Sequence, residues 1–378
     1  MSKHHKEIDI KEYPYDLVVD LRKINDSGIG AYIDNVVIEV LRQLSKNYRI
    51  LAIIKLNCDD FKLSNKIPQV KLLKFVSSPY TLSEQVEFYL RLPKSYFFWA
   101  TSVSTPFFFR GKIIFTIYDL SYLYLKTISA SIAFKQLITW IYFKLGSKKS
   151  SLFLFISEFT KQEFIKTFSN SIKKESILKV VLLGTSDIWR SKISLNPKEK
   201  YLIIIGNLRP HKNMAFAVMA LEKICKNFGL SIYIVGDFGN QSMKDSNLLA
   251  YIKDKKWIKY LGKISEDQLL SVVKNASLLV APSLHEGFGL TVLEGMASGV
   301  PVLASDIPAH REVGGNSIRY FDPCSVTSIN TEALKIFTNE DDSKIIVEIA
   351  RQRSAEFTWS KCSFNTSNEI DGLIKNRC

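Results

Sequence analysis

The sequence predicts an α/β protein built from two doubly wound domains, each a parallel sheet covered by helices. Three observations predict this class. At 378 residues, the chain exceeds the usual size of a single hydrophobic core. Short apolar runs alternate with helical patterns along its length, which is typical of parallel β–α–β units. A polar stretch, SKISLNPKEK at 191–200, separates two such series.

The apolar runs give the expected strands in order, because strands buried on both faces read as near-continuous apolar segments. The clearest helix between them is at 30–46. The expected strands are 16–20, 49–54, 112–117 and 152–157 in the first series, and 201–206, 230–236, 257–262, 277–282 and 300–305 in the second. We therefore assign a Rossmann-like domain to residues 1–194 and a second to 195–358. Ligands of such sheets bind at the carboxyl ends of the strands, here in a cleft between the domains.

Composition indicates a protein of a reducing compartment. The five cysteines are scattered and form no C-x-x-C pair, which argues against a disulfide framework and against a zinc site. The N-terminus is polar, so we expect no signal peptide. No apolar run approaches the ~18 residues that a membrane-spanning helix needs. We expect a cytoplasmic protein, in solution or peripheral on the inner face of the cytoplasmic membrane.

Positive charge is concentrated in the first half of the chain. Residues 1–194 contain 29 Lys and Arg against 17 Asp and Glu, whereas the remainder contains 22 against 20. A solvated surface explains this excess, and so does an anionic membrane. Nucleic acid is the least favoured partner, and we expect none. The segment 131–149 places Phe134, Trp140, Tyr142 and Phe143 beside three lysines, as an interfacial helix would. A core helix with a wet edge fits the same pattern.

A turn after the strand at 201–206 has the character of a phosphate site. In YLIIIGNLRPHKN the strand runs into Gly206 and then into a helix expected near Asn213, with Arg209 and Lys212 in the turn. Glycine lets the backbone approach a phosphate, the helix N-terminus offers free N–H groups, and the cations neutralise the charge. An ordinary basic turn at a helix start would look the same.

Gly28-Ile29-Gly30 forms a similar but weaker pattern before the helix at 30–46. It is not the dinucleotide fingerprint, since Ile33 occupies the place of the third glycine. It is either an ordinary helical turn or a second wall for a diphosphate.

The stretch HEGFGLTVLEGMASGVPVLAS, residues 285–305, has two glutamates around a Gly-Phe-Gly. Glu286 follows the strand at 277–282, and Glu294 lies just over one turn into a helix expected from Leu290. Carboxylates near a helix N-terminus are favourable on dipole grounds alone. Carboxylate acceptors beside exposed backbone donors also suit a polyhydroxylated ligand, and a ribose diol suits one bidentate acid.

These motifs resemble the retaining glycosyltransferases of family four, which have the GT-B fold. The resemblance covers almost the whole chain, and its segments are GIGAYIDNVVIEVL, TIYDLSYL, ISEFTKQEF, VVLLGTSDIW, GNLRPHKN, EGFGLTVLEGMASGVPVLASDIPAHREV and YFDP. The tail, residues 359–378, is similar to the family's terminal helix, which crosses back to the N-terminal domain.

Carried over position by position, the resemblance implies that Lys212 neutralises the donor diphosphate. It implies that Glu286 holds the donor sugar and Glu294 the ribose. The implied donor-binding residues are Gly28, Gly30, Gly206, Asn207, Lys263, Ile264, Gly287, Phe288, Gly289, Leu290, Thr291 and Glu294. The implied catalytic residues are Lys212, Arg209, Glu286, Asp119 and Tyr118.

The chain departs from the family pattern at two positions. The usual arginine after the strand glycine is Asn207, so Arg209 would serve instead, and the usual histidine before Asp119 is Tyr118. No Asp-x-Asp triplet occurs in the chain. We therefore expect neither a metal bridge to the diphosphate nor a cofactor.

The resemblance implies transfer of a hexose from a GDP- or UDP-linked sugar to a glycan acceptor, lipid-linked, in bacterial surface polysaccharide (lipopolysaccharide) synthesis. The Gly-Asn-Leu-x-Pro-x-Lys-Asn turn resembles that of mannosyltransferases and favours GDP-mannose. Two alternatives stay open: a catalytically silent nucleotide-sugar-binding partner, and another GT-B enzyme such as a sugar-nucleotide 2-epimerase.

Overall fold

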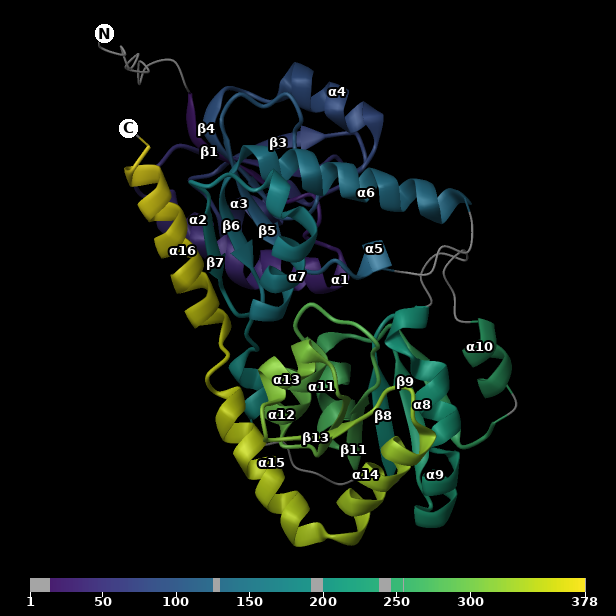
Figure 1. Cartoon of the computed structure of the whole chain (residues 1–378). Helices are drawn as coiled ribbons and strands as arrows, with labels where there is room; N and C mark the ends of the chain where they lie inside the picture. Colours follow the sequence, from purple (N-terminus) through teal and green to yellow (C-terminus); the bar gives the residue numbers. More distant parts are fainter. Residues whose placement is uncertain (1–13, 125–129, 192–199, 238–245, 254, 378) are drawn as a thin grey trace. The chain divides into compact units, whose positions relative to one another are not determined.

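The computed structural model describes residues 14–124, 130–191, 200–237, 246–253 and 255–377 in two compact units (Figure 1). Unit 1 comprises the chain up to Leu182 together with the segment from Trp359, and unit 2 comprises Leu183–Thr358. Each unit is described by itself. The predicted linker at 191–199 lies, apart from Ser191, outside the described residues.

Unit 1 contains a seven-stranded parallel sheet in the order β3-β2-β1-β4-β5-β6-β7. Its strands are β1 (Tyr15–Asp20), β2 (Ile50–Lys55), β3 (Lys71–Phe75), β4 (Ser95–Ala100), β5 (Lys112–Ile117), β6 (Ser150–Phe155) and β7 (Ile177–Val180). Its helices are α1 (Ser27–Tyr32), η2 (Ile33–Val37), α2 (Ile38–Leu44), α3 (Asp60–Lys66), α4 (Leu82–Arg91), α5 (Ser121–Tyr124), α6 (Ala130–Lys149), α7 (Glu158–Phe168), η3 (Ser169–Ser171) and α16 (Trp359–Lys375).

Unit 2 contains a six-stranded parallel sheet in the order β10-β9-β8-β11-β12-β13. Its strands are β8 (Tyr201–Ile205), β9 (Ser231–Val235), β10 (Ile258–Gly262), β11 (Leu278–Ala281), β12 (Val302–Ser305) and β13 (Arg319–Phe321). Its helices are η4 (Asp187–Arg190), η5 (Pro210–Lys212), α8 (Met214–Ala220), α9 (Glu222–Phe228), α10 (Ser246–Ile252), α11 (Glu266–Lys274), α12 (Leu290–Ser298), α13 (Pro308–Gly314), α14 (Val326–Thr338) and α15 (Glu340–Ser354).

The predicted fold class is confirmed, since both sheets are parallel and doubly wound. Sequence reasoning did not assign the strands β3, β4, β7 and β13. β3 and β7 are edge strands with partly exposed residues, so they lack a continuous apolar run. The strand predicted at 152–157 lies at Ser150–Phe155 because Ser157 caps α7, accepting a hydrogen bond from the Thr160 N–H.

The helix predicted at 30–46 is present but begins at Ser27 and contains a π-helical segment, η2, between α1 and α2. The π turn leaves Ile33, Val36 and Val37 buried. The C-terminal helix α16 packs against both η2 and α2, so the end of the chain completes unit 1.

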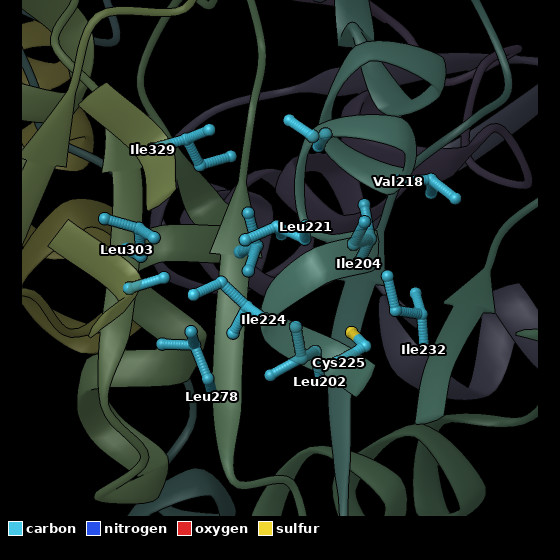
Figure 2. Close-up of a cluster of buried hydrophobic side chains, with 14 of the residues drawn as sticks. Leu202, Ile204, Val218, Leu221, Ile224, Cys225, Ile232, Leu278, Leu303 and Ile329 are labelled. Carbon is cyan, nitrogen blue, oxygen red and sulfur yellow. The ribbon is translucent and has the colours of Figure 1, made fainter. Parts of the chain in front are cut away.

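The core of unit 2 lies against the middle strands of its sheet. Figure 2 shows Leu202 and Ile204 of β8, Leu278 of β11 and Leu303 of β12 facing side chains of α8 and α9. Burial of each such aliphatic side chain contributes about 1.5–3 kcal/mol. This packing fixes β8 beside β11, and hence the loops that follow them.

Unit 1 contains a buried ionic cluster at the carboxyl end of β1. Arg22 donates to Asp20 and to Glu84, both at 2.6 Å, and all three side chains are almost fully buried. Glu84 also accepts hydrogen bonds from the Ser104 hydroxyl, from the Tyr142 hydroxyl at 2.7 Å and from a backbone N–H of residue 80 at 2.9 Å. The cluster therefore joins β1, α4 and α6 through one carboxylate.

The structure corrects the predicted membrane-facing side of α6 at Tyr142, Phe143 and Lys149, which are buried or bonded within unit 1. Lys135 and Lys148 are exposed. Tyr142 is only 3% exposed, because its hydroxyl donates to Glu84. The Lys149 ammonium donates to the carbonyls of Phe107 and Phe109, at 2.5 and 2.8 Å. The polar groups of Tyr142 and Lys149 are therefore bonded within unit 1, whereas Phe134 and Trp140 are exposed. Lys126, another base that we expected near this helix, lies outside the described residues.

The described cysteines, Cys58, Cys225, Cys324 and Cys362, are unpaired. A search of the described helices finds none with the length and apolar character required to cross a membrane.

Glu84→Ala is predicted to destabilise unit 1 by about 3–5 kcal/mol, because it leaves Arg22 buried without its second carboxylate. The free energy of unfolding of unit 1 is measured in urea, with hydrogen exchange of the β1 and β4 amides as the readout. Glu39→Ala, which removes an exposed acid paired with Arg42, is the control and should cost at most about 1 kcal/mol. Equal, small losses in the two variants would show that the cluster does not hold unit 1 together.

Candidate functional site

The candidate site lies where two neighbouring strands of unit 2 end. β8 and β11 pair in parallel, with Leu202 opposite Leu278 and Ile204 opposite Val280. The chain leaving β8 passes through Gly206 into η5, and the chain leaving β11 passes into the Gly-Phe-Gly loop. Both loops therefore emerge at the same edge of the sheet. This is the edge at which doubly wound sheets bind ligands.

Lys212 and Glu286 meet at this edge. The Lys212 Nζ donates to Glu286 Oε1 at 2.5 Å, and the Ser283 hydroxyl donates to the same oxygen at 2.7 Å. Both charged side chains are 21% exposed. A Cβ on Gly206 would lie 3.6 Å from Lys212 Cδ, so the lysine side chain crosses directly over the glycine. The structure thus brings three predicted donor residues together.

The local charges keep Glu286 ionised. Burial alone would raise the pKa of this carboxyl, but Lys212, His310 and the Ser283 hydroxyl outweigh burial and lower the pKa to about 2. Glu286 is therefore a carboxylate at any physiological pH, able to accept hydrogen bonds but not to donate them. This is the behaviour of a group that positions hydroxyls.

His310, on α13, was not predicted from the sequence. It is 1% exposed and lies against the Gly-Phe-Gly loop, since a Cβ on Gly289 would sit 3.1 Å from its Cδ2. Gly289 has φ 110°, a backbone conformation that suits glycine, and it starts α12. Burial lowers the pKa of His310 despite the neighbouring Glu286. Its Nδ1 lies 3.0 Å from the Ser305 carbonyl oxygen, so the neutral ring donates there and leaves Nε2 as an acceptor.

Glu294 lies on α12 and is partly buried. Burial, followed by repulsion from Glu266, raises the pKa of Glu294 to about 8. In the described part of the chain no hydrogen bond or ion pair engages this carboxyl. The two predicted glutamates therefore have opposite electrostatic environments, one paired and one desolvated.

The remaining predicted donor residues of unit 2 spread along the same sheet edge. Arg209 is exposed at the start of η5, beside the partly buried Asn207. Lys263 and Ile264 follow β10, two strands away from β8. In the loop and the first turn of α12, Gly287, Phe288 and Gly289 are buried and Leu290 and Thr291 are partly buried.

The predicted glycines of unit 1 differ in their surroundings. A Cβ on Gly30 would lie 2.5 Å from the Ile24 carbonyl oxygen, so close packing of α1 on the preceding turn requires glycine at this position. A Cβ on Gly28 would meet no atom within 4 Å. Packing thus accounts for Gly30, whereas Gly28 stands at the open start of the helix.

Tyr118 and Asp119 follow β5 in unit 1. The Tyr118 hydroxyl donates to the Thr101 carbonyl at 2.9 Å, and burial raises the pKa of Tyr118 well above its ordinary value. Tyr118 therefore remains a neutral hydrogen-bonding group. Asp119 Oδ1 accepts from the N–H and the hydroxyl of Ser121, at 2.9 and 2.5 Å, which fixes the start of α5.

Among the described residues, no group of three or more His, Cys, Asp or Glu side chains is placed to hold a metal ion. At the unit 2 edge, Lys212, Arg209 and Lys263 carry positive charge that an anionic ligand could meet.

Solved structures identify the architecture as the GT-B fold. A sucrose-phosphate synthase of Thermosynechococcus elongatus superposes with a TM-score of 0.75 at 13% identity, covering 95% of this chain and 99% of that one. The Anabaena protein HepE, solved in complex with UDP and glucose, gives a TM-score of 0.73 at 16% identity, covering 95% and 100%. These likenesses confirm the predicted fold.

Residues 185–353, which lie in unit 2, match the family described as Glycosyl transferases group 1. This matched segment contains Lys212, Glu286 and Glu294. It agrees with the resemblance seen in the sequence.

Two relatives with similar sequences are O-antigen chain mannosyltransferases. The chain is 27% identical over 231 residues to O-antigen chain mannosyltransferase B of Escherichia coli, covering 58% of this chain and 60% of the relative. It is 29% identical over 180 residues to an O-antigen chain mannosyltransferase of Salmonella typhimurium, covering 48% and 49%. The chain thus spans about half to three fifths of the length of these relatives.

The raised pKa of Glu294 predicts a pH-dependent stability of unit 2. Between about pH 4.5 and 8 the folded state holds a proton that the unfolded state releases, so stability falls as the pH rises through this window. Glu294→Gln removes the cost of ionising this buried carboxyl above pH 8. Without ligand, the variant should match wild type near pH 4.5 and be more stable above pH 8 in urea unfolding followed by β11 amide exchange.

Glu340→Gln, at an exposed position of α15, is the control and should follow wild type at both pH values. If the Glu294→Gln and wild-type curves run parallel, then Glu294 is not a desolvated carboxyl.

Proposed function

We propose that this chain is a glycosyltransferase that moves a hexose, mannose in our interpretation, from a nucleotide-diphosphate sugar to a glycan acceptor in surface polysaccharide synthesis. The observation that carries the proposal is the Lys212–Glu286 pair at the ends of β8 and β11. A cation and a carboxylate held side by side suit a ligand that presents a diphosphate next to sugar hydroxyls. The group 1 domain and the two O-antigen mannosyltransferase relatives support it.

The donor is placed by charge and by hydrogen-bonding capacity. Lys212 and Arg209 neutralise the diphosphate beside Gly206. The Glu286 carboxylate accepts hydrogen bonds from the sugar hydroxyls, and the backbone N–H groups of 288–291 donate to them. Glu294 holds the ribose diol, and the turn at Lys263 and Ile264 lines the base. The nucleotide is GDP, or UDP as in the solved complex of the Anabaena protein.

The bond-breaking step builds positive charge on the anomeric carbon and negative charge on the leaving phosphate. Preorganised cations at that phosphate lower the barrier by about 3–4 kcal/mol for each well-placed donor. The acceptor hydroxyl attacks on the face from which the diphosphate departs, its proton passes to the leaving phosphate oxygen, and the configuration is retained. In the proposed mechanism Glu286 positions the sugar and does not act as a nucleophile.

Unit 1 provides the acceptor side in this proposal. We assign Gly28 and Gly30 to donor binding, and Tyr118 and Asp119 to the acceptor side, as the resemblance implies. Because Tyr118 stays neutral, it serves by hydrogen bonding and not by proton transfer. The acceptor is a lipid-linked glycan, so the protein works in the cytoplasm at the inner face of the cytoplasmic membrane. The basic excess of the first half supports this location.

Incubation of the protein with GDP- and UDP-linked sugars and a lipid-linked acceptor tests the function. Release of GDP from GDP-mannose, with mannose on the acceptor in the retained configuration, is the expected result. The rate should be unchanged in EDTA, because in our proposal Lys212 and Arg209, and not a metal ion, neutralise the diphosphate. Donor binding without turnover would favour the silent partner, and an epimerised sugar nucleotide would favour the 2-epimerase. Loss of activity on chelation, restored by magnesium, would refute the metal-independent site.

Glu294→Ala and Glu286→Ala should affect different kinetic constants. Loss of the ribose contact weakens GDP binding by up to about tenfold, as for one hydrogen bond to a neutral carboxyl group. Glu286→Ala instead frees Lys212 for the diphosphate, so GDP binds as well as before or more tightly, while kcat falls. Calorimetry with GDP and steady-state kinetics measure the two effects. Equal losses of GDP affinity with unchanged kcat would contradict these roles.

A further inference from the structure

The amphipathic pattern of helix α4 is inverted. Its buried positions are Glu84, Gln85 and Phe88. Its apolar side chains on the opposite side are exposed: Leu82 by 83%, Val86 by 57%, Tyr89 by 72% and Leu90 by 72%. These four residues recur at the spacing i, i+4, i+7 and i+8, which places them on one face. A helix of this kind at the surface of a soluble unit would normally turn that face inward.

The inversion follows from the buried ionic cluster of unit 1. Glu84 is held by Arg22 and by the Tyr142 hydroxyl, and the Gln85 amide donates to the Thr105 carbonyl at 3.0 Å and to the same hydroxyl at 3.1 Å. Rotating α4 to bury its leucines would remove Glu84 from Arg22, which would then lie in the interior with Asp20 as its one remaining carboxylate partner, and this is strongly unfavourable. The apolar face is therefore fixed outward. Helix α4 itself lies beside α6, and its polar side contacts Tyr142 of that helix (Figure 1).

The exposed face extends beyond the helix. The ring of Phe108, itself 71% exposed, lies edge-on to that of Tyr89 with centroids 6.1 Å apart. We call Leu82, Val86, Tyr89, Leu90 and Phe108 the α4 patch. Isolated exposed apolar residues are ordinary, but a contiguous set of large ones marks a binding surface.

The charges around the α4 patch identify its partner. Residues 76–112 contain two acids, and neither presents an exposed negative charge. Glu84 is buried, and Glu87 is only 11% exposed and paired with Arg91. The bases of this segment are all exposed: Arg91, Lys94, Arg110 and Lys112. Lys94 lies just beyond the end of α4, and Lys112 lies close to it because Lys112 pairs with Phe97 at the start of the β4–β5 ladder. An apolar face bordered by cations is complementary to an anionic lipid surface.

We propose that the α4 patch inserts into the surface of a bilayer that contains anionic phospholipid, with the four bases against the headgroups. A second copy of this chain fits less well, because a symmetric contact would set the same bases against one another. The inference extends the proposed function, on which its purpose rests: docking through α4 brings unit 1 to a lipid-linked acceptor. It moves the membrane contact from the predicted lysines of α6 to a neighbouring helix.

Vesicle co-sedimentation without donor or acceptor tests the proposal. Wild type should bind vesicles of phosphatidylcholine containing about 30% phosphatidylglycerol, and bind phosphatidylcholine alone far more weakly. The triple variant Leu82→Gln, Val86→Gln, Leu90→Gln should lose at least about tenfold in partitioning to the anionic vesicles. Changing Arg110 and Lys112 to Gln should weaken binding and reduce its salt dependence.

The matched control is Leu334→Gln, Ile345→Gln, Ile349→Gln, which removes three apolar residues of unit 2 that are 44–59% exposed. It should bind like wild type. Tyr89→Trp gives a second measurement that needs no loss of binding: its added fluorescence should be quenched by brominated lipid, whereas that of Ile345→Trp should not.

Three outcomes would overturn the proposal. They are failure of wild type to bind anionic vesicles, equal binding by the α4 triple variant, and a lipid-free dimer that this variant converts to a monomer. The last would assign the patch to a second copy. Because no sugar substrate is present, failure of glycosyl transfer would leave these results unaffected. Conversely, the α4 triple variant should keep wild-type activity toward a delipidated acceptor.

Discussion

Parallel pairing of β8 with β11 is the constraint on which the candidate site depends. The register that sets Leu202 opposite Leu278 makes the two strands end side by side. The loops that follow then bring Lys212 and Glu286 to 2.5 Å of one another although they lie far apart in sequence. The core residues that hold these strands together carry no chemistry themselves (Figure 2). Their packing nevertheless fixes the position of Lys212 relative to Glu286.

A second constraint of the same kind operates in unit 1. The carboxylate of Glu84 gathers groups from β1, α6 and the loop after β4, so α4 is fixed by polar contacts and its apolar side is left outside. In unit 2 a polar pair is partly exposed at a strand edge, where a ligand can reach it. In unit 1 the polar cluster is fully buried and its effect is transmitted to the surface through the orientation of a helix.

The parallel sheets follow from the sequence, because continuous apolar strands carry local signals. The contact between Lys212 and Glu286 was not predicted, since it depends on the pairing of β8 with β11. His310 carries no comparable signal, since its position depends on packing of α13 against the Gly-Phe-Gly loop. The misplacement of Tyr142 has a similar cause. An aromatic residue beside lysines looks interfacial, and only the distant Glu84 explains its burial. The edge strands β3 and β7 escaped detection because partial exposure erases their apolar pattern.

The most direct test of the account is a crystal structure of the protein with GDP bound. We predict that the diphosphate lies within hydrogen-bond distance of the Lys212 ammonium, over Gly206, and that the ribose hydroxyls contact Glu294. Glu286 should remain beside Lys212 with one oxygen turned toward the space next to the terminal phosphate. A diphosphate bound elsewhere, with the Lys212–Glu286 pair unchanged and no nucleotide near either residue, would contradict the assignment of this strand edge as the donor site.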